Sequence, residues 1–597
     1  MKNVLKNIRF IGMLAVFSCI TGWVFYADHF AIDKTNRYRP LANGWVSYHA
    51  AMYLRKEGNF INKVRTAISD DLIHGRFRPA FTFYVSSPYA LSPIIHKRSV
   101  SSEGRSYDRL VNGDLRLFSY ILLGSIALSF LFMSLLIYSY TKEVVFSFIP
   151  VCFIPLSPSL TENLLQNYID SQEIPLVLWL SVWMCFLLLA VKTEKKWRMT
   201  GYLIVSALFL LLAFLTKETA LILSVALTAV TIMIACTGDK RKSGIISFFI
   251  MSVIAVACSF SVYLIVSLNN KGYAANYGAL KITVIQEALT ALWNGFSKYS
   301  LNNLYGYIPI CLFFFIAVKE RKKTLNKISM SKHVALLVLL LLLCVGFFFI
   351  LVPWRPILIK YLFPSIFFFS FAVAFSLSFL TAWSKKRFGK KGYVLYILLL
   401  PYLFYYNTIY ARAKQERDYW ADTASYGVSV VDKLAESIER EVNNSVKQQS
   451  IFLEYGNSVD WANNIPWAKL HLMRILNLDK RINLVQQNGS SILNYQMPKA
   501  ELTSLREYEN GQKLYLSNNP HEISTHKFDV VYKGYRVNQR PQSEFDVNVN
   551  TEKICYQITG ERIDWQGRSH SLPEFSLYQY KPAGCKTSSH NSFSGGK

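Results

Sequence analysis

The chain has 597 residues, of which 52% are hydrophobic and only 17% are charged. A soluble globular protein usually carries about a quarter charged residues, and a disordered chain would lack this apolar content. The formal net charge is +27, which taken alone would indicate a polyanionic partner such as nucleic acid. The positions of the apolar and basic residues along the chain decide between these interpretations.

Long apolar blocks recur through the first 410 residues. A block of roughly 17–25 residues can cross the ~30 Å hydrocarbon core of a bilayer. Eleven blocks fit this pattern, near residues 8–27, 116–139, 143–158, 174–191, 200–216, 219–236, 243–267, 302–318, 333–352, 357–383 and 391–410. The third block contains Pro150, Pro155 and Pro158, so we expect it to be bent or partly re-entrant. The sequence therefore predicts a mainly α-helical polytopic membrane protein with about eleven transmembrane helices.

The first block follows Lys2, Lys6 and Arg9, as the apolar core of a signal peptide would. It is long, however, and no small-residue cleavage site follows it before Asp28. We therefore expect this block to be retained as the first membrane helix.

Basic residues gather in alternate connections between the blocks: at the N-terminus, at Lys142, and in the ranges 192–198, 240–242, 319–332 and 385–391. Such connections face the cytoplasm. The pattern predicts an N-terminus inside and a C-terminus outside, and it accounts for most of the net charge. Nucleic-acid binding is therefore excluded as the main explanation of the charge.

The same topology places two large segments outside. One is the loop 28–115, which belongs to a transmembrane domain spanning residues 1–410. The other is an extracytoplasmic α/β or α+β domain at 411–585, followed by a disordered tail at 586–597. Helices are predicted at 412–443 and 462–478, and strands at 450–455, 513–516, 528–532 and 545–555. Cys555 and Cys585 lie where an oxidising compartment would permit a disulfide between them.

The chain has no Walker motif, no glycine-rich dinucleotide motif, no HExxH and no CxxC pair. The candidate functional residues are therefore polar residues at the outer membrane surface, where charges are costly and often functional. Asp28 ends the first block, and its carboxylate could act as a general base. The alternative is that Asp28 simply ends the helix in water.

Two further groups combine carboxylates with other polar residues. Asp70 and Asp71 precede Arg76 and Arg78, whose alternation around Phe77 could direct both guanidinium groups at one phosphate. The alternative is a solvated loop in which Pro79 opens a surface helix. Before the fourth block stand three acids, at Glu162, Asp170 and Glu173. They could orient a substrate or act as a base, or Glu173 could lie in an ordinary helix start before Pro175.

The last two groups supply cations. Lys217 and Glu218 lie between two apolar blocks with almost no loop, either as a tight polar turn or as an ammonium at the mouth of a groove. Arg355 and Lys360, followed by Tyr361, enter the tenth block from the outer side, either to snorkel or to bind a lipid-linked phosphate. All five groups fall on one membrane face under a topology derived without them, which indicates an active site at the outer surface.

These features resemble the GT-C superfamily of integral-membrane, polyprenol-dependent glycosyltransferases, which includes the protein O-mannosyltransferases and the aminoarabinose transferase for lipid A. A bacterial subgroup carries the motif Gly-Arg-Phe-Arg-Pro in the first outer loop, present here as Gly75 to Pro79. The acidic loop at 162–173, the Lys217-Glu218 pair and the stretch 360–364 are similar to other segments of these proteins. Many members have two adjacent acids after the first helix, whereas here His29 follows Asp28.

The resemblance implies a hexosyltransferase of the bacterial cytoplasmic membrane that works on its outer face. A sugar on a polyprenyl phosphate would be attacked, with inversion, by an acceptor hydroxyl on a glycan or glycolipid such as lipopolysaccharide O-antigen. Asp28 would remove the proton, with Asp170 or Glu162 orienting the acceptor or acting as the alternative base. Arg76, Arg78, Arg355 or Lys360 would stabilise the leaving phosphate. No metal ligands are assigned and the cofactor is unknown, although clustered acids could hold a divalent cation.

The sequence alone leaves two other functions open. A flippase-type transporter for a lipid or polysaccharide would carry charges in the middle of its spans, whereas the charges here lie at span ends. A polysaccharide polymerase or ligase typically has its large outer loop late in the chain, whereas here the large loop comes first.

Overall fold

The structure is a computed structural model of the whole chain. It describes residues 12, 60–73, 77–95, 106–143, 145–165, 171–193, 195–236, 242–269, 282–298, 301–321, 327–352, 359–402, 404–418, 437, 440–441, 450–454, 483–485, 513–517, 527–536, 540–549, 552–565 and 575–583. Of the first predicted membrane helix, only Gly12 is among them.

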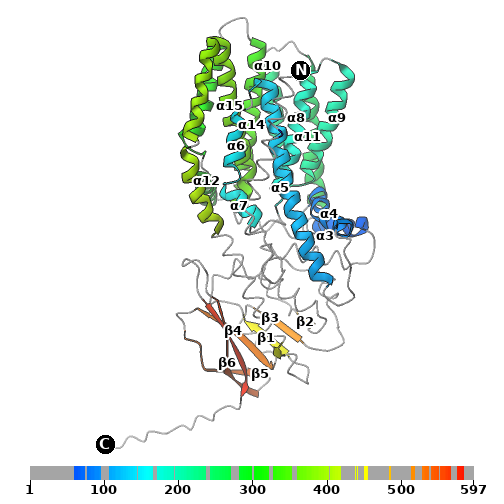
Figure 1. The fold of residues 1–597 in the computed structure, drawn as a ribbon. Helices are drawn as coiled ribbons and strands as arrows, with labels where there is room; N and C mark the ends of the chain where they lie inside the picture. The colour runs from blue at the N-terminus through cyan, green and yellow to red at the C-terminus, as the bar shows by residue number, and fades with distance from the viewer. Residues whose placement is uncertain are drawn as a thin grey trace, which may run out of the picture. The chain divides into compact units, whose positions relative to one another are not determined.

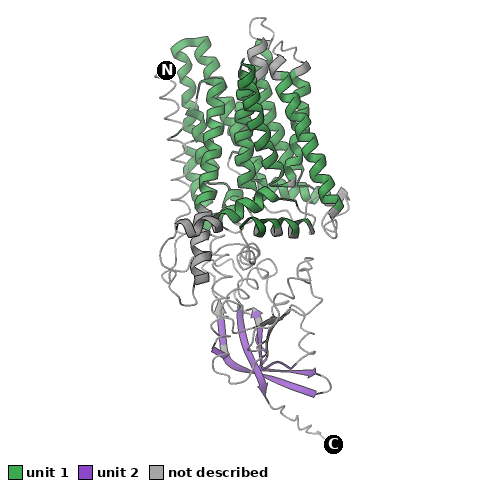
Figure 2. Cartoon of the chain, turned by 90° about the vertical axis from the view of Figure 1, so that its right-hand side faces the viewer, with its two compact units in different colours: residues 1–38, 50–100, 108–420 green, residues 39–49, 101–107, 421–597 purple. Residues whose placement is uncertain are grey.

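The chain forms two compact units (Figure 2). Unit 1 comprises Met1–Tyr38, Ala50–Val100 and Asp108–Trp420, and unit 2 comprises Arg39–His49, Ser101–Tyr107 and Ala421–Lys597. Unit 1 therefore extends to residue 420, whereas the sequence predicts a boundary at residue 410.

Unit 1 is a bundle of helices (Figure 1). Its longer helices are α3 (Phe60–Ile73), α4 (Pro79–Ile95), α5 (Ser106–Thr141), α8 (Glu173–Lys192), α9 (Lys196–Phe214), α10 (Ile222–Cys236), α11 (Lys242–Asn269), α12 (Ile282–Ser297), α13 (Leu304–Arg321), α14 (Lys327–Phe349) and α15 (Phe363–Phe388). Shorter elements are η1 (Val145–Ser147), α6 (Phe148–Phe153), α7 (Pro158–Leu165), η3 (Glu218–Leu221), η5 (Ile359–Leu362) and η6 (Gly389–Leu398). The central helix is α15, in which every residue from Phe363 to Thr381 is buried.

Several of these helices are long and apolar enough to cross a membrane. Five such segments occur among the described residues: Tyr120–Thr141, Glu173–Lys192, Lys196–Phe214, Ile245–Leu268 and the stretch Ile359–Asp418. Two shorter apolar helices, Thr219–Ile234 and His333–Phe349, coincide with further predicted blocks. The chain is thus a multi-pass membrane protein, and the total of eleven spans and the orientation of the termini stay predictions.

The third apolar block forms two helical pieces rather than one straight helix. Val145–Phe153 and Pro158–Leu164 would pass together as one span, but they are bent by 58°. Proline removes a backbone donor and clashes with the preceding helical turn, so Pro155 and Pro158 account for a break at this point. The bend expected from the sequence is therefore present.

Unit 2 contains a seven-stranded sheet in the order β2-β3-β1-β4-β7-β6-β5. Its strands are β1 (Ser450–Glu454), β2 (Asn483–Val485), β3 (Lys513–Ser517), β4 (Val530–Arg536), β5 (Glu544–Val549), β6 (Glu552–Trp565) and β7 (Phe575–Ala583). The pairs β2-β3, β3-β1 and β1-β4 are parallel, whereas β4-β7, β7-β6 and β6-β5 are antiparallel. One half of the sheet is therefore parallel and the other half is antiparallel.

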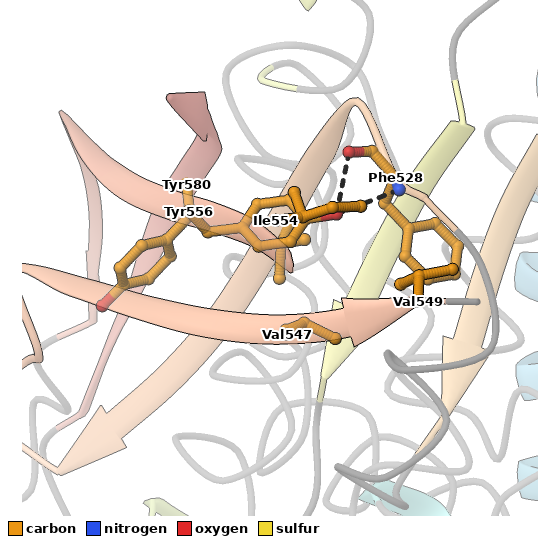
Figure 3. Packing of buried hydrophobic residues seen from close by; sticks show 7 residues of the cluster. Phe528, Val547, Val549, Ile554, Tyr556 and Tyr580 are labelled. Atoms are coloured by element: carbon orange, nitrogen blue, oxygen red, sulfur yellow. Dashed lines mark hydrogen bonds between the residues drawn. The ribbon is translucent and has the colours of Figure 1, made fainter. Parts of the chain in front are cut away.

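An aromatic cluster forms the core of the antiparallel half. Phe528, Val531, Tyr556 and Tyr580 are buried together with apolar residues of β5 and β6 (Figure 3). The Tyr556 hydroxyl donates to the backbone carbonyl of Phe528 at 3.1 Å and accepts from the Phe528 N–H at 3.0 Å. The tyrosine thus brings its polar end into the core without leaving it unsatisfied.

Cys555 in β6 is disulfide-bonded. Its strand partner on β7 is Ala583, two residues before Cys585, which lies outside the described residues. The predicted bridge between Cys555 and Cys585 therefore stays a prediction.

Not every predicted element of unit 2 has the predicted form. The single strand expected at 545–555 is wrong, because β5 and β6 form a hairpin that reverses between Val549 and Glu552. The short strand β2 and the long strand β7 were not predicted. The helix expected at 462–478 lies outside the described residues.

Candidate functional site

The Gly-Arg-Phe-Arg-Pro motif leads directly into α4. The helix begins at Pro79, which is favoured in a first turn because its missing N–H is not needed there. Arg78 is buried, and its carbonyl accepts from the Thr82 N–H at 2.9 Å and from the Thr82 hydroxyl at 3.0 Å. The Ala80 N–H donates to the Leu215 carbonyl at 3.0 Å. The motif is thereby attached to the turn that carries Lys217.

Lys217 lies in the short connection between α9 and η3, and its side chain is buried. The Lys217 ammonium forms an ion pair with Oε1 of Glu173, the first residue of α8. The other oxygen of this carboxylate, Oε2, is buried and has no hydrogen-bond partner. Two residues that lie 44 positions apart thus meet as a buried pair with one carboxylate oxygen left over.

Burial lowers the pKa of the Lys217 ammonium below its ordinary value, because desolvation disfavours the charged form. The Glu173 carboxylate opposes this shift, while the positive charges of Arg78 and Lys360 add to it. Arg78 and Lys360 therefore both act electrostatically on Lys217, although the three residues come from separate segments.

Lys360 lies in η5, immediately before α15, and is held by α7. Its N–H donates to Oε2 of Glu162 at 3.0 Å. Its carbonyl accepts from the Ser159 hydroxyl at 3.1 Å and from the Asn163 amide at 3.0 Å. Residues 159, 162 and 163 are spaced by three and four, so they share one face of α7. Both backbone polar groups of Lys360 are satisfied by that face.

The start of α8 joins this arrangement through Ser171, whose hydroxyl donates to the Asn163 carbonyl at 2.6 Å. Tyr361 lies beside both lysines. Its ring centroid is 4.3 Å from Nζ of Lys217 and 5.2 Å from Nζ of Lys360. An aromatic face at these distances attracts an ammonium group.

Three cations and two carboxylates are therefore buried in one region: Arg78, Lys217, Lys360, Glu162 and Glu173. We call this set the buried charge cluster. Within this set the cations outnumber the carboxylates by one when all members are ionised, and Glu416 acts on Glu162 from outside the set. Three buried cations in one region favour an anionic ligand such as a phosphate, because buried charge is costly unless it is compensated.

Four of the remaining candidate residues, Asp28, Arg76, Asp170 and Arg355, lie outside the described residues. Asp70 and Asp71 belong to α3 and Glu218 begins η3, but the structure describes only the backbone of these three residues. Roles for these residues stay predictions. Among the described residues there is no group of three or more His, Cys, Asp or Glu side chains able to hold a metal ion.

Three residues of the site were not singled out from the sequence: Ser159, Asn163 and Ser171. Serine and asparagine are common in helices and turns, so neither residue type carries a strong signal. The spacing of Ser159, Glu162 and Asn163 on an otherwise apolar segment is the pattern that could have revealed them.

No family model matches the chain, and no curated protein matches it. Among solved structures, the fold is similar to the oligosaccharyltransferase of Archaeoglobus fulgidus tethered to an acceptor peptide, with a TM-score of 0.42 and 11% identity over 78% of this chain. The chain spans 63% of that protein, less than two thirds of its length. The same enzyme in complex with an inhibitory peptide and a dolichol-phosphate gives a TM-score of 0.44 at 11% identity, covering 77% of this chain and 63% of that one.

The fold is also similar to that of ArnT from Cupriavidus metallidurans bound to undecaprenyl phosphate. It has a TM-score of 0.38 and 11% identity, and the match covers 86% of this chain and 98% of that one. Both enzymes are members of the GT-C superfamily that the sequence motifs resemble.

Proposed function

We propose that the chain is a glycosyltransferase that moves a sugar from a polyprenyl-phosphate donor to an acceptor hydroxyl at the outer face of the cytoplasmic membrane. The observation that carries this proposal is the convergence of Arg78, Lys217 and Lys360 in one buried region. A lipid-linked phosphate brings its own apolar chain, and the cluster lies at the ends of helices long enough to cross a membrane.

The cations would act on the phosphate, which gains negative charge as the bond to the sugar breaks. Donors fixed in a water-poor site stabilise such charge without reorganising during the reaction. Arg78 and Lys360 both act electrostatically on Lys217, so we expect the three cations to act on the phosphate together. The donor carries its energy in the phosphate ester, and the transfer therefore requires no nucleotide site.

A carboxylate must take the proton from the acceptor hydroxyl. Asp28 is our preferred base, and Asp170 is the alternative. Oε2 of Glu162 already accepts the Lys360 N–H, which favours a role for Glu162 in positioning Lys360. The acceptor that we propose is a surface glycan or glycolipid, such as lipopolysaccharide O-antigen.

Binding of undecaprenyl phosphate to the purified full-length chain tests the phosphate site directly. We expect the wild-type chain to bind this lipid in detergent and Arg78→Gln to bind it at least tenfold more weakly, because a charge-assisted contact to the phosphate is lost. Native mass spectrometry with a titration of lipid measures both affinities.

Two controls separate recognition of the phosphate from binding of the lipid's polyprenyl tail. Undecaprenol lacks the phosphate, so the wild type and Arg78→Gln should bind it with equal affinity. Arg198→Gln removes an exposed guanidinium near the opposite end of α9 and should bind undecaprenyl phosphate like the wild type. Equal affinity of the wild type and Arg78→Gln for undecaprenyl phosphate would contradict the assignment.

A further inference from the structure

A strongly basic turn comprises the end of α15 and the start of η6, at the opposite end of α15 from Lys360. Five lysines and arginines lie within seven residues: Lys385, Lys386, Arg387, Lys390 and Lys391. The sequence contains no acidic residue between positions 359 and 415. The positive charge of the turn is therefore not neutralised by neighbours along the chain.

The backbone of this turn is closely packed. Gly389 has φ +58°, a conformation that residues with a Cβ rarely adopt. A Cβ on Gly392 would lie 2.5 Å from the Lys385 nitrogen and 2.6 Å from the Ser384 carbonyl carbon. Only glycine at position 392 permits η6 to fold back against the last turn of α15. Close packing therefore fixes the backbone of the turn, which holds its side chains in defined positions.

One lysine of the turn is used to hold it in place. Nζ of Lys385 donates to Oε1 of Glu143 at 2.7 Å and to the Tyr396 hydroxyl at 2.7 Å. The Tyr396 hydroxyl donates in turn to Oε2 of Glu143 at 2.6 Å. This triad joins the turn to the residues just after α5, which ends at Thr141.

The other basic side chains of the turn are exposed. Arg387 pairs with Glu320 at 3.3 Å, but 42% of its side chain stays accessible. Within the described part of the chain, the side chains of Lys386, Lys390 and Lys391 form neither a hydrogen bond nor an ion pair. Their ammonium groups are therefore available to an external anion.

Apolar side chains are exposed beside these cations. The exposed fractions are 53% for Phe388, 54% for Tyr393, 67% for Val394 and 59% for Ile397. A combination of cations, aromatic rings and aliphatic side chains at the end of a membrane helix is typical of the headgroup region of a bilayer. We call residues 386–397 the basic turn surface.

We propose that the basic turn surface binds the headgroups of anionic phospholipids in the leaflet that it faces. Charge complementarity selects this partner, because three free ammonium groups within six residues match lipid phosphates. The place of the turn supports it as well, since α15 lies within a stretch that is long and apolar enough to cross a membrane and brings the turn to one surface of the bilayer. The exposed Phe388, Tyr393 and Val394 would enter the boundary between headgroups and acyl chains.

The test uses the full chain in neutral detergent with phosphatidylglycerol and phosphatidylcholine of the same acyl length. Native mass spectrometry measures the affinity for each lipid. A basic residue near an anionic surface contributes about fivefold in affinity. We therefore expect K386Q/K390Q/K391Q to bind phosphatidylglycerol at least tenfold more weakly than the wild type and phosphatidylcholine equally well.

The matched control is K527Q/R540Q/K553Q, which removes three exposed cations from unit 2 and should leave both affinities within twofold. An unchanged affinity of K386Q/K390Q/K391Q for phosphatidylglycerol would overturn the proposal, as would an equal loss in the control. If K386Q/K390Q/K391Q fails to insert into the membrane, the salt dependence of lipid binding by the wild type still tests the proposal. The affinity of the wild type for phosphatidylglycerol should fall steeply between 50 and 500 mM salt, and an affinity that does not depend on salt would overturn the proposal.

Discussion

The ion pair between Lys217 and Glu173 is the feature of the site that the structure defines best at the residue scale. Both side chains are buried, and each would be costly to bury alone. Oε2 of Glu173 has no partner, so one acceptor remains for a substrate hydroxyl or for a donor brought by the ligand. We therefore expect the pair to compensate its own buried charges and to leave one carboxylate oxygen available to a ligand.

A double-mutant cycle on this pair has a definite expected outcome. Lys217→Met and Glu173→Gln should each destabilise the chain by about 3 kcal/mol, because each leaves the partner charge buried and unpaired. The double variant should be destabilised by clearly less than the sum of the two. Thermal unfolding in detergent, followed by intrinsic fluorescence, measures these differences.

Lys196→Met is the matched control, since this lysine is exposed at the start of α9 and should change stability by at most about 0.5 kcal/mol. Additive effects of the two buried substitutions would show that the pair is not coupled.

The sequence predicted some members of the site and missed others for physical reasons. Glu162, Lys217 and Lys360 stand out because charged residues are rare beside apolar blocks. Their grouping depends on contacts such as that between Glu162 and Lys360, which are 198 positions apart. Local periodicity carries no information about such contacts, and Ser159 and Asn163 act through them.

At the scale of elements, close helix packing depends on particular glycines. A Cβ on Gly346 of α14 would lie 2.1 Å from Cγ1 of Ile222 at the start of α10. A Cβ on Gly306 of α13 would lie 2.1 Å from the Leu301 carbonyl oxygen and 3.0 Å from the Phe369 ring. Both glycines therefore allow neighbouring atoms to lie closer to the helix backbone than the Cβ of alanine would permit.

We expect Gly346→Ala to destabilise unit 1 by about 1–3 kcal/mol, because overpacking forces α10 and α14 apart. Gly306→Ala should have an effect of the same sign. The unfolding midpoint in detergent measures both.

Gly124→Ala in α5 and Gly201→Ala in α9 provide the comparison, since nothing lies within 4 Å of either Cβ position. These substitutions should be neutral, or stabilising by up to about 1 kcal/mol, because alanine favours the helix. Equal effects at all four positions would contradict the packing explanation.

Element types were easier to predict than element limits. The apolar blocks identify the membrane helices because a span must satisfy its backbone internally and face lipid. The hairpin between β5 and β6 was missed because only Asn550 and Thr551 separate two stretches of similar composition. The strand β7 was missed because buried polar residues such as Ser576 and Gln579 weaken the alternation of apolar and polar positions.

For the whole molecule, the main open prediction is which side of the membrane unit 2 faces. The basic connections place the C-terminus outside, and the disulfide at Cys555 is typical of an oxidising compartment. We expect non-reducing peptide mapping of protein purified from cells to recover Cys555 linked to Cys585. A free Cys555 thiol in protein purified with thiols blocked at lysis would contradict the external placement.

We propose that the chain transfers a sugar to a surface glycan, and mass spectrometry of surface glycans from host cells with and without the gene tests this proposal. When the gene is deleted, we expect the glycan to lack one defined sugar mass. Restoring the wild-type gene should restore that mass, whereas Asp28→Asn or Arg78→Ala, inserted at wild-type levels, should not. An identical glycan profile with and without the gene would contradict the claim.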